Sequence, residues 1–317
     1  MSRILQPRLW IAALLFILPV MMSAQQATKV IGRIIAVKVV GSVTVTDVRD
    51  PMRPHKLVER GEVTENQIVN TGDDSKVLLV FSNGATVSLG PKSRLSIEEF
   101  LQDPFTQPVK VSELVDEPTT SSTKLNLIRG ELISNVKHLR REKGSTFTVE
   151  TPVGAAGIRG TTFQITYRTS GNAGSYALRM VEGKIALDFG GRARGVDVVK
   201  DQQVVLDGVQ LDASGRLVSL PSSIKATDIP ESIKASLSAA AQSLVDAASA
   251  VNFQAMKPAE NPQQAYPQSS GSSSDGGASP DSTTRNGTTS SSYFTPLSPV
   301  PPAMPPAPRT TPGDGRI

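Results

Sequence analysis

The chain has 317 residues and a formal net charge of +4, with no cysteine and two histidines. The lack of cysteine excludes disulfides, thiol catalysis, thiolate-bound metals and a lipid attached to cysteine. Two histidines are too few for a histidine-rich metal site. The mildly basic balance favours anionic neighbours such as lipid phosphates or acidic glycans.

Residues 1–24 have the pattern of a secretory signal peptide. Arg3 and Arg8 give a basic start, and the apolar run 9–18 follows. This run is shorter than the roughly 20 residues that a membrane-spanning helix needs. We therefore expect cleavage and a periplasmic or secreted chain. An uncleaved membrane anchor is the alternative, because hydrophobicity continues through Met22.

From about residue 29 to residue 220, apolar and polar residues alternate with a period of two, which indicates β-strands. The apolar run within residues 76–81 is typical of a strand buried on both faces. Asn83-Gly84 follows it and predicts a hairpin. Residues 103–123 are polar and predict a loop. The sequence thus favours an all-β fold, a compact body of short strands with β-solenoid-like or sandwich layering.

A pattern of apolar residue, charged residue and glycine recurs within these strands. It ends at Gly130, Gly183 and Gly208, and Ser82-Asn83-Gly84 has the same role with asparagine at the turn. Each occurrence predicts a strand, a glycine turn and a second strand. The spacing between occurrences is irregular, so the pattern is not a clean solenoid repeat.

Residues 146–167 predict two strands joined by a glycine-rich connection. The spacing of its glycines invites comparison with a phosphate-binding loop. In such a loop a lysine follows the last glycine and a helix begins there. Here Thr161-Thr162 follow Gly160, and a predicted strand comes next. We therefore interpret the connection as structural and not as a nucleotide site.

Residues 222–256 predict one amphipathic helix, with Pro230 suited to its first turn. Its apolar stripe is thin and rich in alanine. We expect this stripe to dock on the β body, and self-association of the helix is the alternative. In residues 257–317 proline, serine, glycine and threonine dominate. So few large apolar residues cannot offset the entropy of ordering, which predicts a disordered tail.

Several blocks of the sequence, between about residues 30 and 190, resemble a FecR domain and follow that family's order. The blocks are Gly61 to Gly72, Ser75 to Leu89, Gly130 to Leu132, Phe147 to Pro152, Arg159 to Phe163 and Val181 to Ile185. The most specific part of the resemblance is a structural motif. It comprises Thr151, Pro152, Arg159, Gly160, Thr161 and Phe163.

The resemblance implies an exported, non-enzymatic β domain that works by binding an envelope protein or an anionic envelope polymer. In the best-known members it relays the state of an outer-membrane receptor to a sigma factor, which is cell-surface signalling. Those regulators carry a cytoplasmic helical segment before their membrane helix, whereas here residues 1–8 precede the apolar run. A structural extracytoplasmic scaffold without a signalling role is the alternative.

The densest basic cluster comprises Lys137, Arg140, Arg141 and Lys143. It is a candidate anion-binding patch, and a solvated hairpin tip is the alternative. Aromatic residues make up 4% of the chain, too few for the stacking that single-stranded nucleic acid needs, so we expect no nucleic-acid partner. No G-x-S-x-G motif accompanies the histidines. We expect no catalytic residues, no cofactor and no metal.

Overall fold

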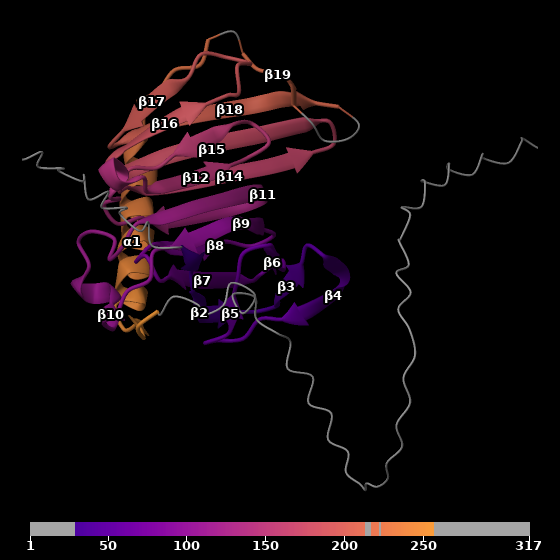
Figure 1. The fold of residues 1–317 in the computed structure, drawn as a ribbon. Helices are drawn as coiled ribbons and strands as arrows, with labels where there is room; N and C mark the ends of the chain where they lie inside the picture. Colours follow the sequence, from indigo (N-terminus) through magenta and orange to yellow (C-terminus); the bar gives the residue numbers. More distant parts are fainter. Residues whose placement is uncertain (1–28, 213–216, 222, 257–317) are drawn as a thin grey trace, which may run out of the picture. The chain divides into compact units, whose positions relative to one another are not determined.

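The computed structural model describes residues 29–212, 217–221 and 223–256. Within these ranges the chain is mostly β-strand, and it contains one α-helix, α1 (Glu231–Ala248) (Figure 1). The predicted all-β fold with one helix after the main strands is therefore confirmed. The predicted signal peptide and tail lie outside the described residues. No helix in the described part of the chain is long and apolar enough to span a membrane.

Two sheets form the body, and the first is called sheet A. Neighbouring strands in sheet A are, in order, β4 (Asp50–Lys56), β3 (Val43–Asp47), β6 (Gln67–Thr71), β9 (Arg94–Gln102), the first part of β11 (Ser121–Asn135), β12 (Thr146–Glu150), β13 (Ala155–Gly157), β16 (Lys184–Asp188) and β17 (Val196–Val199). The short strand β1 (Val30–Ile31) also pairs with β9. All of these pairs are antiparallel except β11 with β12.

The second sheet, sheet B, is antiparallel throughout. Its strands are, in order, β5 (Glu62–Val63), β2 (Ile34–Val40), β7 (Lys76–Phe81), β8 (Thr86–Leu89), the second part of β11, β14 (Thr162–Ser170), β15 (Ala173–Glu182) and β18 (Gln202–Leu211), which also pairs with β19 (Leu217–Ser219) and β20 (Thr227–Asp228). Because β11 belongs to both sheets, it joins their strands into one hydrogen-bonded network.

Strand β11 passes from sheet A to sheet B at Gly130. Residues up to Arg129 pair with β9, and residues from Gly130 onward pair with β14. Gly130 has φ +102°, and a Cβ atom there would lie 2.2 Å from Oγ of Ser93. The predicted reversal of the chain at this glycine is wrong. A positive φ here bends the strand without turning it back, and the sequence pattern does not separate these two outcomes.

Alternation along the strands places apolar side chains of both sheets in one shared core. In β14, Phe163, Ile165 and Tyr167 are buried, whereas Gln164 and Thr166 are partly exposed. Successive side chains of a strand point to opposite faces, so this pattern assigns one face of β14 to the core. The sequence leaves β-solenoid-like and sandwich layering open, and two sheets around one shared core correspond to the second.

The predicted hairpin at Asn83-Gly84 connects β7 and β8. Gly84 N–H donates to the carbonyl of Phe81 at 2.8 Å, which closes the turn. Asn83 is buried, and its Nδ2 donates to Oγ of Ser121 at 3.1 Å. The turn is therefore fixed to β11 as well as to its own strands.

Helix α1 runs across the strands on the outer face of sheet B (Figure 1). Its buried residues are Leu237, Ala241, Leu244 and Ala248. The helix is docked on the β body, which is the expectation from its apolar stripe, with self-association as the alternative. On the outer face of β7, Leu78 lies beside α1 and Val80 packs in a second apolar cluster, which is why that strand is buried on both faces.

The stretch 103–123, predicted as a loop, contains β10 (Val109–Lys110) and a short 3-10 helix, η1 (Val111–Glu113). Strand β10 pairs with β21 (Asn252–Phe253), which follows α1. A second, smaller apolar cluster forms around this pair. Its buried members are Val80, Phe105, Val111, Ala248, Phe253 and Met256. Residues of this stretch thus pack the end of α1 against sheet B.

Candidate functional site

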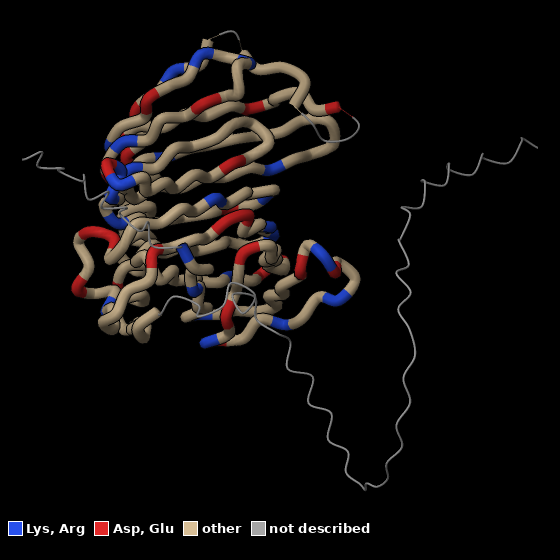
Figure 2. Tube along the Cα trace, in the orientation of Figure 1, with Lys and Arg blue, Asp and Glu red and all other residues tan. Residues whose placement is uncertain are grey.

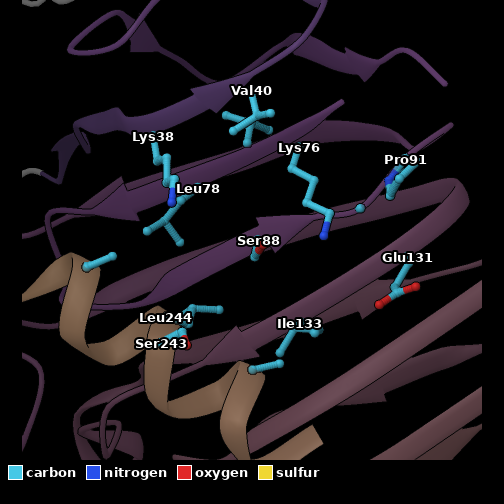
Figure 3. Close-up of a pocket in the computed structure, with 14 residues that line it drawn as sticks. Lys38, Val40, Lys76, Leu78, Ser88, Pro91, Glu131, Ile133, Ser243 and Leu244 are labelled. Carbon is cyan, nitrogen blue, oxygen red and sulfur yellow. The ribbon is translucent and has the colours of Figure 1, made fainter. Parts of the chain in front are cut away.

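A groove of about 470 Å³ lies between α1 and the outer face of sheet B. Val40 of β2, Leu78 of β7 and Ile133 of β11 line it on the sheet side, and Leu244 lines it on the helix side (Figure 3). Leu78 is almost fully buried, whereas Val40 retains 43% of its exposure. The groove therefore has an apolar floor that is partly open to solvent.

Local sequence explains why this space is not filled. The helix presents Ala240 and Ala247 to the groove, and alanine side chains fill less space than larger apolar ones do. In β2 the register shifts between Ala36 and Lys38, which is the mark of a β-bulge. Lys38 and Val40, two residues apart, both line the groove as a result.

Three charged side chains lie around this apolar floor: Lys38, Lys76 and Glu131 (Figure 3). Glu131 accepts a hydrogen bond from Nε2 of Gln164 at 2.9 Å and forms an ion pair with Arg168 at 3.6 Å. Within the described residues, neither lysine has a hydrogen bond or an ion pair. The groove therefore offers two free ammonium groups beside apolar surface.

The basic cluster predicted from the sequence is divided among different environments. Burial lowers the pKa of Lys137, which lines a small cavity of about 120 Å³ beside the end of α1. Arg140 donates from Nε to the carbonyl of Glu117 at 3.0 Å. Arg141 and Lys143 lie in the 3-10 helix η2 (Arg141–Lys143) and are exposed. Figure 2 marks Lys and Arg in blue and Asp and Glu in red along the chain; in η2, the acidic residue Glu142 lies between Arg141 and Lys143.

Glu117, which sequence reasoning missed, anchors this turn. Its side chain is fully buried and accepts hydrogen bonds from Ser121 Oγ at 2.6 Å, from Arg140 N–H at 2.6 Å and from Ser145 Oγ. A single glutamate in a polar stretch carries no signal of burial. The hydrogen-bond donors around the Glu117 carboxylate come together only when residues 103–120 fold against β11.

The first part of the family motif forms a tight turn between β12 and β13. Oγ1 of Thr151 accepts hydrogen bonds from the N–H groups of Val153 at 3.3 Å and Gly154 at 3.2 Å. Thr151 N–H also donates to the carbonyl of Gly154 at 2.9 Å. Pro152 lies second in this turn, where its restricted φ is favourable. These two residues have a structural role.

The second part of the motif connects β13 to β14. Phe163 is fully buried, and Thr161 accepts a hydrogen bond at its carbonyl from Val136 N–H at 2.9 Å. Gly160 has φ +84°, and a Cβ atom there would lie 2.7 Å from Nδ1 of His138. Arg159 is exposed, and within the described residues its side chain has no hydrogen bond or ion pair. The motif thus contains structural residues and one free guanidinium group.

The comparison with protein families agrees with the sequence resemblance. The family model described as "FecR protein" matches residues 67–186. Two crystal structures of a putative anti-sigma factor from Parabacteroides distasonis ATCC 8503, at 2.50 and 1.65 Å resolution, are similar at 14% identity and a TM-score of 0.35. Each alignment covers 51% of this chain and 59% of that chain, so it spans less than two thirds of that protein. No curated protein matches. Residues 67–186, from β6 into β16, form a FecR domain.

Proposed function

We propose that this chain is an exported binding domain, and that the groove between α1 and sheet B holds a segment of another envelope protein. The observation that carries the proposal is the pair of free lysines, Lys38 and Lys76, beside an apolar floor. A partner segment with an apolar side chain next to an acidic one would complement both features. The size of the groove suits a few side chains.

Two further observations support this proposal. The FecR family is regulatory rather than enzymatic, which is consistent with a role in binding. The pattern of residues 1–24 supports export to the envelope. A role in cell-surface signalling follows if the partner is a receptor, because a receptor segment in the groove would link its state to this domain.

The test is a pull-down from an envelope fraction with the purified chain as bait. The groove variant is Lys38→Glu with Lys76→Glu. The control, Lys56→Glu with Lys200→Glu, makes the same change in net charge at exposed lysines outside the groove. We expect the wild-type chain and the control to capture one protein that the groove variant loses. Equal capture by all three chains, or retention of a polymer alone, would contradict the proposal.

A further inference from the structure

A second hollow, of about 310 Å³, lies in sheet A where β13 ends. Strand β13 is short and pairs with β12 on one side and β16 on the other. In the last pairing Gly157 lies between Thr148 and Ala186. After Gly157 the chain continues to β14 in sheet B. No strand therefore lies between β12 and β16 beyond this residue. The hollow is the space left there.

Two arginines from different parts of the sequence line this hollow. Arg141 comes from η2, and Arg159 comes from the connection between β13 and β14. Both are exposed, and within the described residues neither side chain has a hydrogen bond or an ion pair. None of the residues lining the hollow is acidic, although exposed Glu142 is adjacent to Arg141 in sequence. The charge facing the hollow is therefore positive.

The backbone that carries each arginine is held in place. Before Arg159, the N–H of Ile158 donates to the carbonyl of Phe147 at 2.9 Å. The N–H of Arg141 donates to the carbonyl of Leu139 at 2.8 Å, and Gly144 N–H donates back to the carbonyl of Arg141 at 2.9 Å. Less backbone freedom is then lost when a ligand binds, which favours affinity.

We propose that this hollow binds an oxyanion group, either a carboxylate or a phosphate. The planar guanidinium group presents paired N–H donors that match the oxygens of both groups. The hydroxyl groups of Thr146 and Thr148, which also line the hollow, add further possible donors. Of the basic cluster predicted from the sequence, Arg141 alone lines this hollow, and its companion is Arg159 of the family motif. The site lies in sheet A and does not depend on the groove of sheet B.

Small residues keep the hollow open, and this allows a test that leaves the charges unchanged. A Cβ atom at Gly157 would meet only the carbonyl oxygen of Ala186, at 3.8 Å. The φ angle of Gly157 is not in the left-handed region, so a valine fits the backbone of β13. Its methyl groups would then occupy part of the hollow. Gly157→Val therefore blocks the site sterically while both arginines remain.

The experiment is an NMR titration that follows the arginine Nε–Hε signals. Inorganic phosphate and acetate are added separately, and the signals of Arg141 and Arg159 are assigned from their loss in Arg141→Gln and Arg159→Gln. We expect saturable shifts of both signals with at least one anion. A response to phosphate alone assigns a phosphate-bearing ligand, and a response to acetate alone assigns a carboxylate.

Each arginine variant should bind the anion about tenfold more weakly, since a hydrogen bond to a charged group contributes roughly that factor. Gly157→Val should abolish the saturable shifts. Arg192→Gln, at an exposed arginine outside the hollow, is the control and should bind as the wild type does. Shifts that do not saturate, or an equal loss of affinity in the control, would overturn the proposal. The backbone amide spectrum shows whether Gly157→Val folds. If it does not, the anion affinities of Arg141→Gln and Arg159→Gln test the proposal without it.

Discussion

The buried carboxylate of Glu117 accepts a hydrogen bond from the hydroxyl of Ser121 at 2.6 Å. The same carboxylate accepts hydrogen bonds from Arg140 N–H, before η2, and from Ser145 Oγ, after it. It therefore links both ends of the η2 turn to the start of β11, where Ser121 lies. The carboxylate forms no ion pair within the described residues. Its charge is stabilised by hydrogen bonds, which fix the turn carrying Arg141.

Glu117→Ala should destabilise the protein strongly. The substitution leaves two serine hydroxyls and one backbone N–H without their acceptor, and each unsatisfied buried donor costs about 1–3 kcal/mol. We expect a clearly lower urea midpoint. The control is Glu142→Ala, which changes an exposed glutamate of η2 and should leave the midpoint unchanged. Equal midpoints for the two variants would show that the hydrogen bonds to Glu117 add little stability.

Gly160→Val should destabilise the protein by about 1–2 kcal/mol or more, because valine is strained at positive φ. A Cβ atom there would also lie 2.9 Å from Cα of His138. Gly157→Val, in the same connection, is the matched control. It has open space and no positive φ, so its free energy of unfolding should stay close to that of the wild type. Chemical denaturation of both variants measures the difference, and equal losses would refute the structural role of Gly160.

Phe163→Ala should lower the free energy of unfolding by about 3–5 kcal/mol, through lost burial and the cavity left behind. The ring is fully buried in the shared core. Arg159→Ala, four residues earlier in the motif, removes an exposed side chain and should leave the urea midpoint unchanged. If Phe163→Ala were as stable as the wild type, the segment would be an exposed loop and not part of the core.

Tyr176→Phe should reduce the loss of stability at alkaline pH. The hydroxyl of Tyr176 is buried and has no hydrogen-bond partner among the residues that the structure describes, and burial raises its pKa well above the ordinary value of about 10. Above about pH 10 the unfolded chain releases this proton while the folded chain keeps it, so stability falls as pH rises.

Free energies of unfolding at about pH 7 and about pH 11 measure this effect, because the two values lie on either side of the ordinary tyrosine pKa. The wild-type chain should lose more stability between them than the Tyr176→Phe variant does. Removing the unsatisfied hydroxyl should also make the variant at least as stable as the wild type near neutral pH. Equal losses in the two chains would mean that the Tyr176 hydroxyl is solvated in the folded state.

Local patterns in the sequence predicted the elements whose causes are local. The alternation around Phe163 predicted β14, and Asn83-Gly84 predicted the hairpin between β7 and β8. The spacing of apolar residues predicted the helix within 222–256, which forms as Glu231–Ala248. Each of these signals depends on residues a few positions apart, so the sequence by itself was sufficient to determine them.

Only the tertiary structure decided which distant segments meet. The passage of β11 between sheets at Gly130, the burial of Glu117 and the approach of Arg141 and Arg159 to one hollow all depend on strand pairing over long separations. Positive φ at a glycine permits a turn or a bend, and exposed charge permits a solvated tip or a binding site. The chain's local preferences do not distinguish these alternatives, and the packing of the two sheets selects among them.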